Sequence, residues 1–215
     1  MSSIPLPVEQ TEALRNTPVQ QRSATRVTLL LDAAATLIDE KGIDGLTTSD
    51  VAARSESSVG VVYRYYPNIQ SLLLALAARN LERFMARNVE LLTQPSTDFL
   101  SGLDPVIDLA VDMARNEPGF RALRFGTIID QRFVDGRNPT NAQMATAFTA
   151  FMHERYGIAV TPALELDVEV SVEVSEALLQ RAFQFDKNGD ERFISKARTI
   201  LHDLLGSYAA EARAQ

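Results

Sequence analysis

Residues 47–66 read TTSDVAARSESSVGVVYRYY, and this stretch decides how the rest of the chain is interpreted. Its first part predicts a short helix, because the hydroxyl of Thr47 can accept a hydrogen bond from an early helical N–H and the carboxylate of Asp50 follows three residues later. The four polar residues at 55–58 then favour a turn, since serines compete for backbone hydrogen bonds. The first helix of the stretch is therefore expected to end early.

A second short helix is expected after this turn. Ser57 or Ser58 can cap it, and it should run from about residue 59 to 65. Pro67 disfavours helical geometry at Tyr66 and so ends the helix. Two short helices joined by a turn of three or four residues fit a helix-turn-helix, which places its second helix in the major groove of DNA.

The second helix carries side chains suited to a major groove. Gly60 has no side chain, so the backbone there can approach a phosphate or a base edge closely, and Val61 can contact a thymine methyl. Tyrosine hydroxyls and a guanidinium follow for phosphates or bases. On periodicity alone, an ordinary helical hairpin with a tyrosine-rich packing face fits equally well. The residues expected to contact DNA are Thr48, Ser57, Ser58, Val59, Gly60, Val61, Tyr63, Arg64 and Tyr65.

Residues 26–84 resemble the DNA-binding domain of the TetR/AcrR family of bacterial transcriptional regulators. The resemblance is carried by an alanine-rich first helix at 33–35, by Gly42, by the threonine start at 47–48 and by the recognition-helix sequence GVVYRYY at 60–66. It implies an all-α fold with an N-terminal three-helix helix-turn-helix domain. A larger C-terminal helical domain for ligand binding and dimerisation is implied to follow.

Three features depart from the commonest pattern of that family. Val61 stands where a threonine is frequent, and Glu56 with Ser57 replaces the usual Gly-Val of the turn. Ile69 stands where a lysine often contacts a phosphate. Glu56 adds a charge that DNA repels, and Ile69 removes one expected contact, but the scaffold is retained.

The chain divides into three expected parts: a flexible N-terminal arm at 1–18, which holds three prolines, a helix-turn-helix DNA-binding domain at 19–67, and a helical ligand-binding and dimerisation domain at 68–215. Apolar residues at helical spacing, with breaks at Gly and Pro, predict the longer helices. These helices are expected at about 19–41, 68–93, 162–186 and 190–212, with two or three more within 99–157.

Composition excludes several classes of protein. The 215 residues contain no Cys, which rules out disulfides and thiolate metal sites and suits the reducing cytoplasm, where we expect the protein. No apolar run reaches the roughly 18 residues of a membrane helix, so no membrane partner is expected, and no signal peptide is recognised at the N-terminus. The net charge is −7, and residues 1–66 hold six Lys and Arg against eight Asp and Glu. This balance predicts weak binding to random DNA.

Large apolar residues between 99 and 157 suggest a ligand pocket, because the resemblance implies one in this region. A stripe of Met and Phe is more often core than pocket, and both interpretations stay open here. His153 has no second His at a metal-ligand spacing, so no metal or cofactor is expected. The pocket candidates are Phe84, Met113, Phe120, Arg124, Phe125, Phe148 and Met152.

Residues 164–174 alternate apolar and polar residues, which is the period of a half-buried strand. On a helix at 100° per residue, Leu164, Val168 and Val172 fall within roughly 80° of one another, and a second apolar set falls on the opposite side. We expect a helix that faces its own core on one side and a partner subunit on the other. The expected dimer residues are Leu166, Val170, Val174, Leu201, Leu204 and Leu205.

The resulting hypothesis is a transcriptional repressor that binds an inverted-repeat operator in double-stranded DNA as a homodimer and is released by a small-molecule effector. The two-fold axis should place the recognition helices about 34–36 Å apart, one turn of DNA. The alternative is a helical module that binds a small molecule or a protein and whose helix-turn-helix is not used on DNA. An enzyme is not expected, because two His, no Cys and no Gly-rich phosphate loop leave little for catalysis.

Overall fold

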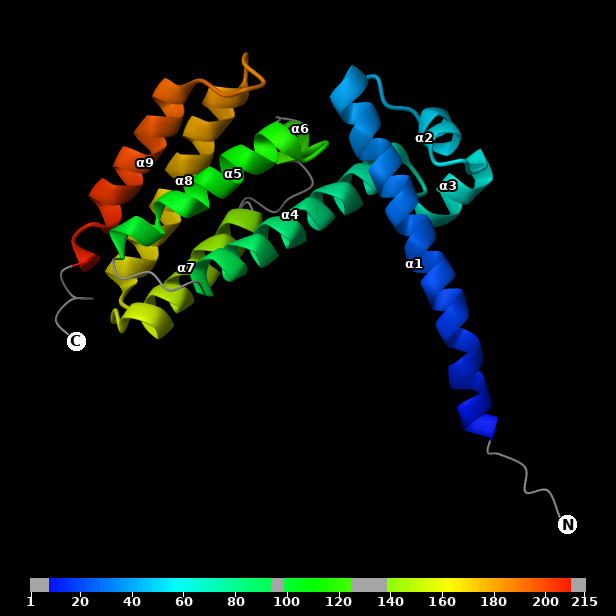
Figure 1. The fold of residues 1–215 in the computed structure, drawn as a ribbon, viewed down its shortest axis with the longest axis horizontal. Helices are drawn as coiled ribbons and strands as arrows, with labels where there is room; N and C mark the ends of the chain where they lie inside the picture. The colour runs from blue at the N-terminus through cyan, green and yellow to red at the C-terminus, as the bar shows by residue number, and fades with distance from the viewer. Residues whose placement is uncertain (1–7, 94–98, 125–138, 210–215) are drawn as a thin grey trace, which may run out of the picture. The chain divides into compact units, whose positions relative to one another are not determined.

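The computed structural model describes residues 8–93, 99–124 and 139–209, and within these ranges every regular element is a helix (Figure 1). This confirms the all-α prediction. The chain forms two compact units, residues 1–76 and residues 77–215. The division falls inside helix α4 (Ile69–Thr93) rather than at its start, so α4 contributes to both units.

Over residues 8–76, the first unit holds three helices and the beginning of α4. Helix α1 (Val8–Lys41) is long, and the short helices α2 (Thr48–Arg54) and α3 (Val59–Tyr65) follow it. Its core is built from residues that are almost fully inaccessible to solvent: Leu30, Ala34, Ile38, Val51, Val62, Leu72 and Leu76. The two short helices that the sequence predicts at 47–66 are therefore confirmed, with the second at its predicted bounds.

The expected flexible arm at 1–18 is wrong for residues 8–18, which lie in α1. This segment, VEQTEALRNTP, is rich in residues with good helix propensity and has no Gly to break it. Pro18 lies inside the helix, so its local preference against helix interiors is overridden here.

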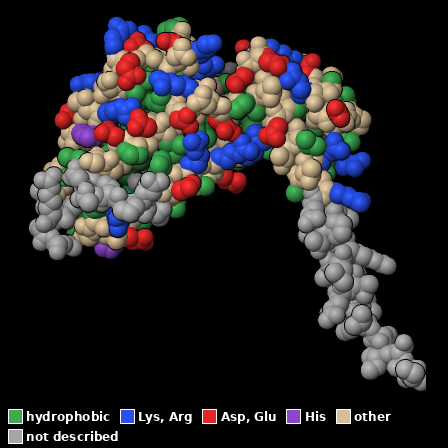
Figure 2. All heavy atoms as spheres, in the orientation of Figure 1, with side chains coloured by type: hydrophobic (Ala, Val, Ile, Leu, Met, Phe, Trp, Pro, Cys, Tyr) green, Lys and Arg blue, Asp and Glu red, His purple; other side chains and the backbone are tan. Residues whose placement is uncertain are grey.

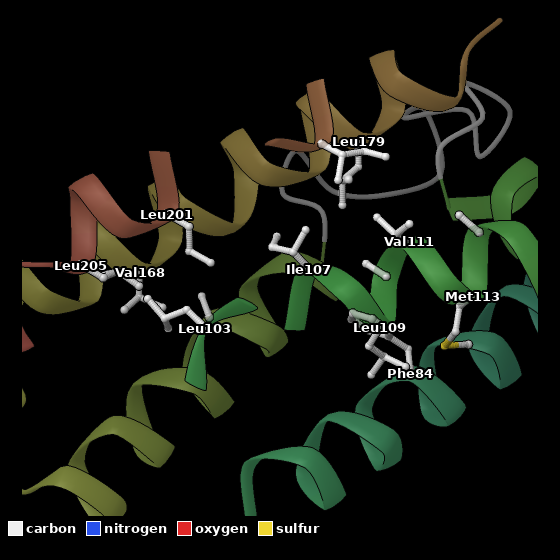
Figure 3. Packing of buried hydrophobic residues seen from close by; sticks show 14 of the residues in the cluster. Phe84, Leu103, Ile107, Leu109, Val111, Met113, Val168, Leu179, Leu201 and Leu205 are labelled. Carbon is white, nitrogen blue, oxygen red and sulfur yellow. The ribbon is translucent and has the colours of Figure 1, made fainter. Parts of the chain in front are cut away.

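The second unit holds the remaining helices. They are the short 3₁₀ helix η1 (Leu100–Gly102) and the helices α5 (Asp104–Asn116), α6 (Phe120–Arg124), α7 (Pro139–Tyr156), α8 (Pro162–Phe183) and α9 (Glu191–Leu205). Figure 3 shows side chains of α5, Ile107 and Leu109 among them, lying between Phe84 of α4 and Leu179 of α8. Helix α9 ends before residue 212, because a turn at Gly206 interrupts it.

Helix α8 resolves the conflict between strand and helix at 164–174. The Thr161 hydroxyl caps it by accepting from the Leu164 N–H, and Pro162 occupies its first turn, where a missing N–H costs nothing. Leu164 and Val168 are 0% exposed, whereas Leu166 is 58% exposed. The predicted helix with two apolar faces is confirmed, and one of those faces is buried in the core of the second unit.

None of the helices in the described ranges is both long enough and apolar enough to cross a lipid bilayer.

Candidate DNA interface and ligand cavity

Two side-chain caps set the geometry of the helix-turn-helix. The Thr47 hydroxyl accepts from the Asp50 N–H at 3.1 Å, and the Ser58 hydroxyl accepts from the Val61 N–H at 3.3 Å. The Asp50 carboxylate also accepts hydrogen bonds from Lys41 and Thr47, and both lower the pKa of Asp50. The cap at Thr47 is confirmed, and of the two serines proposed to cap the second helix it is Ser58 that does so.

The turn between α2 and α3 contains a non-glycine residue with a positive φ. Glu56 has φ +51°, in the left-handed region that costs an L-residue about 1–2 kcal/mol. The Arg26 guanidinium donates to the Ser57 hydroxyl at 3.0 Å, and the Ser57 N–H donates to the Ala52 carbonyl at 2.8 Å. Arg26 and these backbone contacts therefore stabilise a turn that a glycine would adopt more easily.

Helix α3 buries one face and exposes the other. Val62 is completely buried, while Ser58, Val59, Gly60, Tyr63 and Arg64 are exposed. The Thr48 hydroxyl donates to the Tyr63 hydroxyl at 3.3 Å, which ties the start of α2 to the exposed side of α3. The other four predicted contact residues, Thr48, Ser57, Val61 and Tyr65, are half-buried.

The cations of this unit are partly neutralised. Arg54 donates to the Glu40 carboxylate at 2.6 Å, and this hydrogen bond lowers the pKa of Glu40 and raises that of Arg54. Lys41 pairs with Asp50. On the face drawn in Figure 2, basic and acidic side chains are interspersed over the described residues. Among the cations of this unit whose side chains the structure describes, exposed Arg22 and Arg64 are thus the most open to DNA phosphates.

The second unit contains a cavity of about 300 Å³, near the lower end of the range for small-molecule sites. Three of the predicted pocket residues, Phe84, Arg124 and Phe148, line it. Much of the remaining wall is apolar, and includes Met85, Val89, Ile107, Phe151, Val172 and Leu179.

Three residues that were predicted to line the pocket do not line this cavity. Met113, Phe120 and Met152 are at most 2% exposed and pack in the core, because their helices turn these positions away from the cavity wall. Phe125 lies outside the described residues.

The cavity wall also contains polar residues that were not predicted. Asn88 of α4 and Glu154 of α7 line it, as do Ser171, Ser175 and Glu176 of α8. Ser171 and Ser175 follow Leu164 and Val168 along the buried face of α8 at helical spacing. Small polar residues on an otherwise apolar helical face were the sequence signal that could have revealed a polar wall.

Arg124 and Glu176 form a largely buried ion pair on that wall. Arg124 Nη1 lies 3.0 Å from Glu176 Oε1, and the two side chains are 14% and 16% exposed. Arg124 Nη2 donates to Asn141 Oδ1 at 2.8 Å, and Asn141 Nδ2 donates to Glu176 Oε2. Burial lowers the pKa of Arg124, and the charge of Glu176 opposes that shift.

The predicted dimer residues fall into two groups. Leu166 and Val170 are exposed, and Val174 is half-buried on the same side of α8. The prediction is wrong for Leu205, which is 0% exposed, and for Leu201, which is buried and lines the cavity. Both point inward, because the apolar stripe of α9 packs against the core. Leu204 is half-buried against the same core.

No group of three or more potential metal ligands among His, Cys, Asp and Glu occurs in the part of the chain that the structure describes. His153 Nδ1 lies 3.0 Å from the Ile158 carbonyl, a contact that closes the C-terminal end of α7.

Comparison with protein families gives two matches that together cover most of the chain. The family described as "Bacterial regulatory proteins, tetR family" matches residues 30–76. The family described as "Tetracyclin repressor-like, C-terminal domain" matches residues 98–208.

Known structures and a curated relative are also similar. A TetR-family transcriptional regulator from Streptomyces coelicolor is 35% identical, with a TM-score of 0.72 over 86% of this chain and 98% of that one. The fatty acid degradation regulator FadR from Bacillus halodurans shares the fold at 13% identity, with a TM-score of 0.61 over 82% of this chain and 94% of that one. The nucleoid occlusion factor SlmA from Mannheimia succiniciproducens is 25% identical over 57% of this chain, which spans only 55% of that relative.

Proposed function

The chain belongs to the tetR family of bacterial regulatory proteins, and we propose that it is a repressor that binds an inverted-repeat operator as a homodimer and leaves it when a small molecule binds. The domain arrangement proposed with it is a DNA-binding domain at 19–67 and a ligand-binding and dimerisation domain at 68–215. The observation that carries the proposal is the capped, outward-facing helix α3.

Operator binding rests on the exposed surface of α3. Ser58, Gly60, Tyr63 and Arg64 face solvent while Val62 anchors the helix to its own unit. Hydroxyls and a guanidinium bind phosphates and base edges, and an open glycine lets the backbone approach them. The near balance of charge in this unit makes specific contacts more important than general attraction to DNA.

Dimerisation rests on the exposed face of α8. Leu166 and Val170 are large apolar residues left in solvent on a helix whose opposite face is buried. The same helix of a second copy can cover this face in a two-fold symmetric contact, in which each copy contributes the same residues. A two-fold dimer also supplies the two recognition helices that an inverted repeat requires.

Ligand release rests on the cavity in the second unit. A molecule bound there shifts the protein between two states only by its difference in affinity for them, and a change from 1:99 to 99:1 needs about 5.5 kcal/mol. An apolar wall around a cavity of this size is suited to supply such a difference.

The test is a gel-shift experiment with the DNA upstream of the protein's own gene and with selected inverted repeats. Tyr63→Ala and Arg64→Ala should each weaken operator binding by about 1–3 kcal/mol and leave the melting temperature nearly unchanged, because both side chains are exposed. Arg87→Ala, which removes an exposed arginine of α4 paired with Asp112, is the control. Failure of every such DNA to bind at micromolar protein would refute the proposal.

A further inference from the structure

Two buried polar atoms, in residues that line the cavity, have no hydrogen-bond partner among the described residues. They are Asn88 Oδ1 and Ser175 Oγ, and the two residues are only 8% and 9% exposed. The amide of Asn88 is oriented by its Nδ2, which donates to the Phe84 carbonyl at 2.9 Å, so the oxygen is the free end. Buried polar groups are normally paired, and an unpaired one is costly.

Two of the three charged residues on the wall are matched with each other, and the third, Glu154, is exposed to solvent. Arg124 is paired with Glu176, and Asn141 bridges both side chains. An anionic ligand at Arg124 would compete with Glu176, and a cationic ligand at Glu176 would compete with Arg124. A charged ligand group placed beside the Arg124–Glu176 pair therefore loses its hydration without gaining an unpaired counter-ion.

Apart from these polar groups, the wall is lined largely by aliphatic and aromatic side chains from α4, α5, α7 and α8, including Val89, Ile107, Phe151 and Leu179. This lining favours a ligand whose body is hydrocarbon. What remains to be satisfied is one acceptor, Asn88 Oδ1, and one hydroxyl, Ser175 Oγ, which both donates and accepts.

We propose that the cavity takes an uncharged, mostly apolar alcohol, whose hydroxyl donates to Asn88 Oδ1 and accepts from the Ser175 hydroxyl. This proposal rests on the proposed function only in placing the effector in this cavity. It assigns the chemical class of the effector as a neutral amphiphile, rather than a fatty acid or an organic cation.

The probes are four molecules with one hydrocarbon chain: 1-octanol, octyl methyl ether, octanoate and octylammonium. Binding to the full-length protein without DNA is measured by isothermal titration calorimetry. We expect 1-octanol to bind about threefold to tenfold more tightly than the ether, which cannot donate a hydrogen bond. It should also bind more tightly than both ions. A preference for octanoate would overturn the proposal in favour of Arg124 as the anchor, and equal binding of alcohol and ether, or no binding of any probe, would also overturn it.

Ser175→Ala provides the second arm of the test. It should weaken the binding of 1-octanol, whose oxygen loses the Ser175 donor, and it should raise the melting temperature of the free protein, because an unpaired buried hydroxyl is removed. Ser171→Ala is the matched control, since Ser171 lies one turn earlier on the same wall but its hydroxyl already donates to the Asp167 carbonyl at 2.6 Å. An unchanged affinity for 1-octanol in Ser175→Ala would refute the assignment.

The outcome is separable from that of the proposed function. If 1-octanol binds as expected but does not release the operator in a gel shift, the cavity assignment stands and the release mechanism fails. If the operator is released by octanoate or octylammonium while 1-octanol does not bind, the release mechanism stands and this assignment fails.

Discussion

Replacing Gly60 by Ala should make the protein more stable and a weaker DNA binder. Gly60 is the second residue of α3, is exposed, and has an ordinary negative φ. A Cβ built on it would have the Ser58 hydroxyl as its nearest neighbour, at 3.9 Å, which is ordinary van der Waals contact. Nothing within the folded chain therefore requires glycine at this position.

The size of the stability change follows from helix propensity. Ala is favoured over Gly in a helix by roughly 0.8–1 kcal/mol, and somewhat less is expected in a first turn. A gain of about 0.5–1 kcal/mol corresponds to a rise of about 1–4 °C in melting temperature for a chain of this size. On DNA the added methyl occupies the space through which the backbone would approach a phosphate or base edge, so operator affinity should fall about tenfold, or about 1.4 kcal/mol.

Thermal unfolding followed by circular dichroism and operator titration by fluorescence anisotropy measure the two effects on the same preparation. Ala78→Gly, at an exposed position of α4, is the control, because it should lower stability by about 1 kcal/mol without changing operator affinity. The reasoning is refuted if Gly60→Ala binds the operator as tightly as the parent protein. It is also refuted if the variant loses stability, which would mean that the glycine serves the fold.

Three further changes test other parts of the molecule. Leu166→Ala removes a side chain that is 58% exposed in the single chain. With a buried leucine worth about 1.5–3 kcal/mol and two copies in the interface, the dimer dissociation constant measured by sedimentation velocity should rise about 100-fold or more, whereas Leu74→Ala, 43% exposed in the first unit, should not change it. Glu56→Gly should raise the free energy of unfolding in a urea titration by about 0.5–1 kcal/mol, because glycine adopts a φ of +51° without strain, and an unchanged or lower value would contradict that account of the turn. Hydrogen bonds from the side chain and the backbone of Arg192 hold the pKa of Asp190, the N-cap of α9, at about 2, below its ordinary 3.8. A carboxylate with a lowered pKa stabilises the fold above pH 3.8, and this contribution is lost as pH falls through 2. Asp190→Asn should therefore flatten the dependence of the melting temperature on pH between pH 4 and 2, and a slope equal to that of the parent would contradict this account.

Much of the first unit could be predicted because its signals act over a few residues. The hydroxyl of Thr47, that of Ser58 and the fixed ring of Pro67 act on the backbone within one turn, so the starts of α2 and α3 and the end of α3 follow from local chemistry. Local chemistry also misled at residues 8–18, where the prolines suggested an arm and the helix-forming residues between them form part of α1.

The sequence by itself predicted the caps of the two short helices and the two-faced character of α8, because each depends on periodicity or capping within one segment. Its resemblance to the TetR/AcrR family implied the all-α fold and the helix-turn-helix. Only the tertiary structure decided which large side chains are core and which line the cavity. Phe148 lines the cavity and Met152, one turn later on α7, does not. Leu205 lies inside the core, and Arg124 meets Glu176 across 52 positions of the chain. These outcomes depend on how helices distant in the sequence pack against one another, and the apolar period of a single helix carries no information about its neighbours.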